Sequence, residues 1–148
     1  AIALAGDPRL IIVDEPTAGL DPAERVRFLN LLAELGENAV VILSTHIVDD
    51  VSDLCSRMAI IAMGEVLLEG APAESIAALD GQIWSRVLSS DDELRAIEAE
   101  LKVVSSHLVA GQHEIRVFAA SSPGAGFRAV PSGLEDVYFL NVSRQARN

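Results

Sequence analysis

Two adjacent carboxylates, Asp14 and Glu15, follow directly after an apolar run at residues 10–13. Such a run is typical of a buried strand, and open α/β sheets bind ligands at the carboxyl ends of their strands. Successive side chains on a strand point to opposite faces, so one carboxylate can hold a metal ion and the other a water molecule. For the dipeptide alone, the simpler interpretation is a turn that ends a strand in solvent. The longer run through Gly-Leu-Asp-Pro to Pro22 is harder to explain that way.

Short apolar runs alternate with helical patterns around these carboxylates. We expect buried strands at residues 10–13, 39–43 and 58–62, which predicts an α/β layer with parallel strands. Asp21 suits the N-cap of an intervening helix, with Pro22 at its first position. Ser44-Thr45-His46 closes the second strand, and His46 is either a functional group or a strand-end histidine bound by the backbone. Residues 1–5 resemble the end of a helix.

Charge and composition exclude several classes of protein. The net charge is −11 and the single lysine is Lys102, so the chain lacks the clustered basic residues that nucleic-acid binding requires. One cysteine, Cys55, excludes an internal disulfide framework. The apolar runs are far shorter than the roughly 20 residues of a membrane helix. Residues 1–80 hold 14 acidic and four basic side chains, whereas 81–148 hold eight and seven, which suggests a boundary near residue 80.

Residues 81–148 predict a small α+β unit. We expect a strand at 83–88, a helix at 91–101, a hairpin that pairs 103–109 with 114–118, and a closing helix at 134–142. This order suggests an abbreviated ferredoxin-like layer. It carries no recognisable catalytic set, and His107 and His113 are expected at the surface.

In residues 1–80 the motifs, in their order and spacing, resemble the nucleotide-binding domain of ATP-binding cassette (ABC) transporters. Residues 10–14 look like the Walker B strand, Glu15 like the catalytic glutamate, 18–21 like the D-loop and 44–46 like the switch loop. Residues 54–70 are similar to the segment that follows the switch in this family. A weaker likeness at residues 131–138 is to the C-terminal end of exporter-type domains.

The resemblance implies a role for each matched residue. Asp14 would hold Mg²⁺, and Glu15 would polarise the water that attacks the γ-phosphate of ATP. His46 would bind that phosphate, and Asp21 would lie at the interface with a second nucleotide-binding subunit. The full-length protein would use ATP and Mg²⁺, work with a transmembrane permease subunit, and sit in the cytoplasm on the inner face of the membrane.

Two family motifs are missing. The phosphate loop GxxxxGK[ST] is absent, because no glycine-rich loop precedes Lys102, and no Gly-Gly pair exists for the signature motif. The chain therefore resembles a fragment that holds the hydrolytic half of a nucleotide site. We expect the parent protein to be an ATPase. The fragment by itself should neither bind ATP tightly nor hydrolyse it.

The fold class follows from the same absence. We expect a partial P-loop NTPase sheet that lacks the phosphate-loop strand in residues 1–80, followed by the small α+β unit in 81–148. In the family that strand lies between those at 39–43 and 58–62. The gap should close, or the fragment should exchange strands with a second copy or self-associate.

Two other functions stay open from the sequence. A DNA-repair-type ABC ATPase shares a similar Asp-Glu-Pro strand, although the negative charge and residues 54–70 favour a transporter. A noncatalytic regulatory or dimerisation module derived from an ABC ATPase is the alternative of a different class. The sequence immediately upstream would discriminate between an enzyme and such a module.

Overall fold

A computed structural model describes residues 8–145, so the helix end expected at residues 1–5 lies outside the described residues. The fold is mixed α/β, with small sheets rather than one large sheet. The chain forms two compact units, Ala1–Cys55 and Ser56–Asn148. The domain boundary expected near residue 80 was based on charge distribution and on the resemblance to a family. The two units observed here are instead defined by which residues pack against one another. That division therefore stays a prediction.

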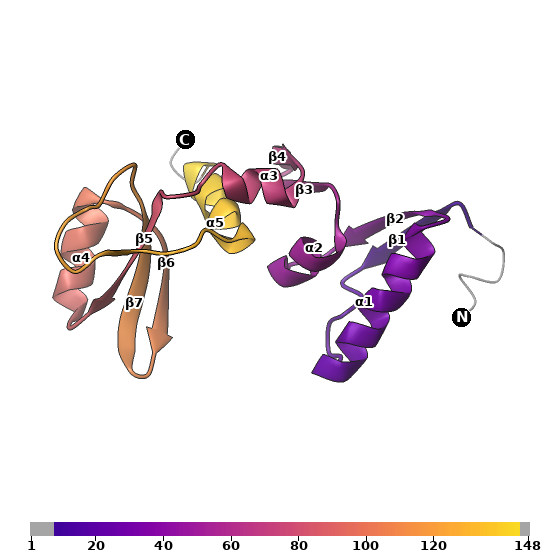
Figure 1. Cartoon of the computed structure of the whole chain (residues 1–148), viewed down its shortest axis with the longest axis horizontal. Helices are drawn as coiled ribbons and strands as arrows, with labels where there is room; N and C mark the ends of the chain where they lie inside the picture. The colour runs from indigo at the N-terminus through magenta and orange to yellow at the C-terminus, as the bar shows by residue number, and fades with distance from the viewer. Residues whose placement is uncertain (1–7, 146–148) are drawn as a thin grey trace. The chain divides into compact units, whose positions relative to one another are not determined.

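The first unit contains a parallel pair of strands joined by a helix (Figure 1). Strand β1 (Leu10–Asp14) pairs with β2 (Val40–Ser44), and their last residues, Asp14 and Ser44, lie opposite each other. Helix α1 (Pro22–Gly36) connects them, and Asp21 caps it in a capping box with Glu24. The parallel arrangement and the start of this helix were both predicted from the sequence.

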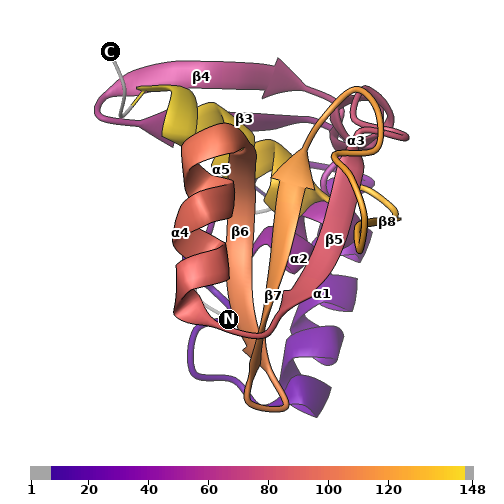
Figure 2. The ribbon, with the colours of Figure 1, turned by 90° about the vertical axis from the view of Figure 1, so that its left-hand side faces the viewer.

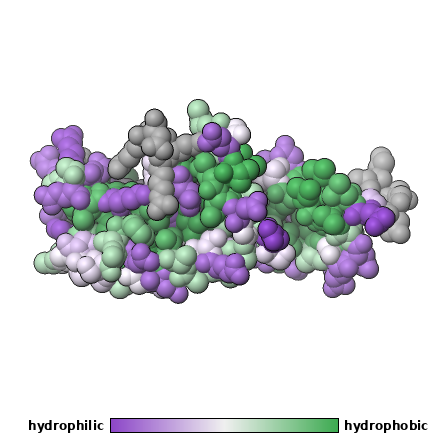
Figure 3. All heavy atoms as spheres, turned by 90° about the horizontal axis from the view of Figure 1, so that it is seen from above, coloured by the Kyte–Doolittle hydropathy of each residue, from purple (hydrophilic) through white to green (hydrophobic). Residues whose placement is uncertain are grey.

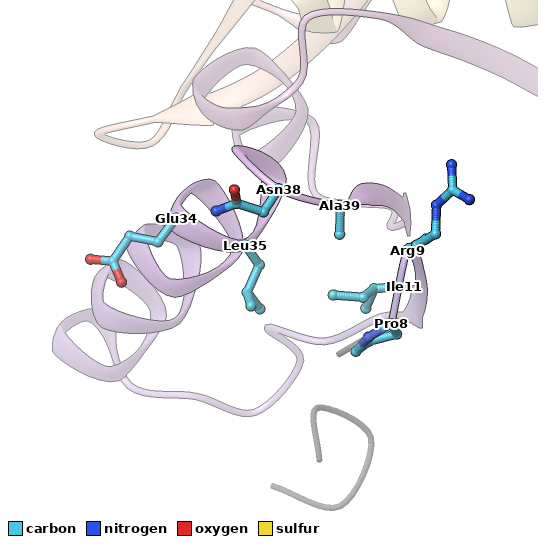
Figure 4. Close-up of a pocket in the computed structure, with 7 residues that line it drawn as sticks. All are labelled: Pro8, Arg9, Ile11, Glu34, Leu35, Asn38 and Ala39. Carbon is cyan, nitrogen blue, oxygen red and sulfur yellow. The ribbon is translucent and has the colours of Figure 1, made fainter. Parts of the chain in front are cut away.

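The β1–β2 sheet has one apolar face that no described residue of the first unit covers. Ile11 is buried on the face toward α1, where Leu35 points toward it (Figure 4). Alternation places Leu10 and Ile12, with their register partners on β2, on the opposite face. The exposed fraction there is at least half for each of Leu10, Ile12, Val40 and Ile42. Figure 3 shows the hydrophobic patch that they contribute to over this sheet, at the right.

The second unit begins with a hairpin. Strand β3 (Met58–Ala62) pairs antiparallel with β4 (Glu65–Gly70). The connecting Met63 and Gly64 both have positive φ, at 51° and 80°, as a two-residue hairpin turn requires. Because β3 finds its partner in the adjacent segment, β2 and β3 lie in different sheets. The three outcomes expected for the gap stay predictions, since β2 and β3 belong to different units.

A four-stranded antiparallel sheet forms most of the second unit, in the order β6-β7-β5-β8 (Figure 2). The strands and helices of this part are β5 (Ile83–Leu88), β6 (Lys102–Val109), β7 (Gln112–Phe118), β8 (Arg128–Ala129), α3 (Pro72–Ala77), α4 (Asp91–Glu100) and α5 (Leu134–Gln145). The expected strand, helix, hairpin and closing helix are thus all present. The short β8 was not predicted, since two residues give no periodicity to detect.

Helices pack on both faces of this sheet. On one face Leu94 and Ile97 of α4 pack against Leu88, Ile115 and Val117. On the other, residues of α5 complete a second apolar cluster, with members Ile83, Val104, Leu140, Phe118 and Phe139. The second unit therefore buries its apolar side chains within itself.

Candidate functional site

The carboxyl ends of β1 and β2 lie side by side and bring Asp14, Glu15 and His46 to the same edge of the sheet. Asp14 is the last residue of β1, and its carboxylate accepts a hydrogen bond from the hydroxyl of Ser44, the last residue of β2. Asp14 is exposed. An exposed carboxylate beside a hydroxyl offers oxygen atoms of the kind that Mg²⁺ binds.

Glu15 turns away from the strand and contacts His46. Its φ of 44° is in the left-handed region, which a residue with a side chain adopts at a cost of order 1 kcal/mol and which is common at functional sites. Its amide donates to the carbonyl of Ser44 at 2.8 Å. Its carboxylate accepts from the backbone amide of His46 at 3.0 Å and lies 2.8 Å from the His46 imidazole Nδ1. Nδ1 must carry the proton in this contact, because a carboxylate oxygen can only accept.

The two adjacent carboxylates therefore contact different partners, because the chain leaves the strand at Glu15. Asp14 contacts Ser44, whereas Glu15 contacts His46 and lies within 3.5 Å of the Thr45 hydroxyl. A carboxylate held next to an exposed imidazole can accept a proton from water or orient it.

Asp21 lies elsewhere in the first unit. Its side chain accepts a hydrogen bond from the backbone amide of Glu24 at 2.8 Å, and so begins α1. No described hydrogen bond joins it to Glu15 or His46. The structure thus gives Asp21 a capping role, which neither supports nor opposes an interface role.

Sequence reasoning missed a buried carboxylate next to this site. Asp50 of α2 (Val48–Leu54) has no exposed surface and binds both Thr17 and Arg25. The sequence holds one signal of this burial. Asp50 lies three residues after Ile47 and four before Leu54, so on a helix it shares a face with these two apolar side chains. Burial, with a further contribution from the Asp50 carboxylate, raises the pKa of the Cys55 thiol. Cys55 therefore stays protonated at neutral pH.

The residues present fit a magnesium ion only in part. Within residues 8–145 no group of three or more His, Cys, Asp or Glu side chains could enclose a metal ion. Magnesium in phosphate-transfer sites keeps several waters and uses one or two carboxylates plus substrate oxygens, so Asp14 fits one such position. No glycine-rich loop is present to cradle phosphates, and Lys102, the single lysine, belongs to the other unit.

A pocket of about 450 Å³ lies at the opposite end of β1 from Asp14 and Glu15. Figure 4 shows Ile11, Leu35 and Ala39 around its centre, while the charged ends of Glu34 and Arg9 point away from it. Because no charged group points inward, we assign this pocket no ligand.

Comparison with known proteins places the site in context. No protein-family model matches the chain. The Nod factor export ATP-binding protein I of Rhizobium meliloti is 31% identical over 160 residues, covering 100% of this chain and 47% of that protein. The ABC transporter A family member 6 of Arabidopsis thaliana is 31% identical over 107 residues, covering 72% of this chain and 12% of that protein.

The homologues of this chain are ATP-binding proteins of ABC transporters. The sequence resemblance is thereby confirmed, and the chain spans about half the length of the Nod factor export proteins that it matches. Among solved structures, CbiO1 from Clostridium perfringens, part of the ABC transporter complex CbiONQ, is 31% identical. The matched region covers 64% of this chain and 34% of the CbiO1 chain, with a TM-score of 0.44. Within residues 8–145, no helix is long and apolar enough to span a bilayer.

Proposed function

We propose that this chain supplies the hydrolytic half of the ATPase site of an ABC transporter. Residues 1–80 would form the C-terminal half of the ATPase core, as a partial P-loop sheet without its phosphate-loop strand. Residues 81–148 would be an accessory or regulatory unit. The homologues support the family, and the direct contact between Glu15 and His46 is the observation that carries the proposal.

In this proposal each site residue has one task. Asp14, exposed beside Ser44, provides a carboxylate oxygen for Mg²⁺, directly or through water. Glu15 orients and polarises the attacking water, and His46 hydrogen-bonds the γ-phosphate. When bound, Mg²⁺ and ATP supply the charge neutralisation and the phosphoryl group. Asp21, near the start of α1, would link this site to that of a second nucleotide-binding subunit.

By itself the chain should neither bind ATP tightly nor hydrolyse it, because most phosphate affinity in such sites comes from backbone amides and a lysine of the missing loop. The test is a calorimetric titration with Mg²⁺ and ATP. We expect no heat of binding. Binding in the micromolar range would mean that other residues cradle the phosphates and would overturn this part of the proposal.

The active role is tested by restoring the missing half. The chain is fused to the phosphate-loop-bearing half of a relative such as the Rhizobium meliloti protein, and Mg²⁺-dependent phosphate release is measured. Glu15→Gln should abolish release, while Glu37→Gln, at an exposed glutamate of the same unit, should leave it unchanged. Equal rates in both variants would remove Glu15 from the mechanism.

The partners follow from the same role. We propose that the full-length protein works with a transmembrane permease subunit and a second nucleotide-binding subunit, on the cytoplasmic face of the membrane. We also propose that the chain alone self-associates or exchanges strands. The exposed apolar face of β1–β2 supports this, because flat apolar sheet surfaces and unpaired strand edges favour association.

A further inference from the structure

Asp50 is a buried carboxylate to which the proposed hydrolysis assigns no task. Its side chain has no exposed surface, although charged groups are almost never fully buried unless they are paired. It lies on α2, four residues after His46. A group of this kind, so close to the candidate site, needs a physical explanation.

Its two oxygen atoms bind two different segments. Oδ2 accepts a hydrogen bond from the hydroxyl of Thr17 at 2.5 Å, and Oδ1 accepts one from Nε of Arg25 at 2.7 Å. Thr17 is itself buried, and it follows Glu15 by two residues, in the loop that leads to α1. Arg25 belongs to α1. Asp50 therefore ties both the loop and the helix to α2.

Two links thus connect the loop that carries Glu15 with the segment that carries His46. The first, between Glu15 and His46 themselves, is open to solvent, because the His46 side chain is 78% exposed. Exposed links of this kind contribute little to order, since water competes for the same atoms. The second, between Thr17 and Asp50, is buried, where an unmade hydrogen bond is costly.

We propose that Asp50 is a positioning residue which, through Thr17, holds Glu15 in contact with His46. The importance of that contact for ATP hydrolysis rests on the function proposed above. The positioning itself does not, because it concerns the geometry of this chain without nucleotide. The competing explanation is that Asp50 only pairs with Arg25 to fasten α1 to α2.

Separate variants distinguish the two explanations, because Thr17 and Arg25 bind different oxygens of Asp50. Thr17→Val keeps the shape of the side chain and removes only the link to the loop, whereas Thr17→Ser keeps the hydroxyl. Arg25→Gln removes only the link to α1. Asp50→Asn weakens both and risks unfolding the unit, so the Thr17 pair is the main test.

The measurement uses NMR on the ¹⁵N-labelled chain without nucleotide. The reporter is the backbone amide of His46, whose hydrogen bond to Glu15 shifts its proton resonance and slows its exchange. Glu15→Ala defines the signal of a freed amide. The backbone amide of Val40, bonded at 3.0 Å to the carbonyl of Arg9 in the same unit, reports that the first unit remains folded.

We expect Thr17→Val to speed exchange at His46 roughly tenfold, toward the Glu15→Ala value, with Thr17→Ser close to wild type. Arg25→Gln should leave the His46 signal unchanged. The proposal is overturned if Thr17→Val leaves His46 as in wild type, or if Arg25→Gln moves it equally. Because no ATP is present, these outcomes are independent of the phosphate-release test of the proposed function.

Discussion

The two compact units bury very different side chains. Among the described residues of the first unit, the buried ones are Ile11, Leu32, Thr17 and Asp50, of which half are polar or charged. The described part of the second unit buries nine large apolar side chains, and those of its four-stranded sheet lie between α4 and α5. The unit that holds the candidate site therefore has the smaller core.

The sheet types explain this difference. Parallel strands are normally covered on both faces, and their apolar side chains point to both, but α1 covers only one face of β1–β2. Ile12 on the other face remains 68% exposed. In the second unit, helices cover both faces of the antiparallel sheet. The first unit thus has an incomplete core, whereas the second is complete by itself.

The largest expected change in the free energy of unfolding comes from a substitution in the core of the second unit. Ile115→Ala removes a side chain with no exposed surface, so the free energy of unfolding should fall by about 2–5 kcal/mol. Ile12→Ala, the same change on the uncovered face, should alter it by less than about 0.5 kcal/mol. Urea unfolding followed by circular dichroism, and by the fluorescence of Trp84 for Ile115→Ala, measures both. Similar losses would show that the β1–β2 face is covered in solution.

A second contrast lies between two ion pairs of the second unit. Arg116 donates two hydrogen bonds, at 2.7 and 2.8 Å, to the buried Asp136, which raises the pKa of the guanidinium. Arg116→Met leaves that carboxylate without its charged partner and should lower the free energy of unfolding by about 3 kcal/mol. Arg128→Met breaks the exposed pair with Glu114 and should lower it by less than about 1 kcal/mol. Urea unfolding at neutral pH compares them, and equal losses would contradict the burial argument.

The uncovered face of the first unit should control association. Replacing Ile12 and Ile42 together by serine removes apolar area from the exposed face and should lower the apparent mass of the chain in sedimentation at high concentration. Leu108→Ser, at an exposed leucine on β6 of the other unit, is the matched control and should leave the mass unchanged. A wild-type chain that is monomeric at every concentration would contradict the proposed self-association.

The smallest expected effect is a pH dependence in the second unit. Hydrogen bonds from the Ser85 hydroxyl and then from Arg128 lower the pKa of Glu114 below its ordinary value of 4.5. The ionised form is therefore favoured by folding. Its contribution to stability is present above pH 4.5 and is lost as the pH falls through the lower pKa of the folded state.

The matching measurement is the urea midpoint between neutral pH and about pH 3, for the wild type and Glu114→Gln. The wild type should lose more stability below pH 4.5 than the variant, by a small margin because Glu114 is partly exposed. If the urea midpoints of the two proteins fall in parallel with pH, Glu114 does not contribute to the pH dependence of stability.

Local patterns in the sequence predicted most of the elements. The run before Asp14, the Asp21-Pro22 start of α1 and the hairpin near Gly111 are all encoded by neighbouring residues, although the hairpin turn is shorter than the strands expected at 103–109 and 114–118 imply. The family likeness was also confirmed, because it depends on motif order. The turn of β3 back into β4 is likewise local. The buried Asp50 was not predicted, because its burial depends on the distant Thr17 and Arg25.

By itself the sequence determined the strand ends, the adjacent carboxylates and the relationship to ABC transporter ATP-binding proteins. These follow from short-range periodicity, capping and motif spacing. The tertiary structure alone decided that Glu15 contacts His46 and that Asp50 holds both Thr17 and Arg25. It also decided that one face of β1–β2 stays exposed. Each of these depends on segments about 25 or more residues apart, and no local pattern records which distant side chain will supply a hydrogen bond or cover a face.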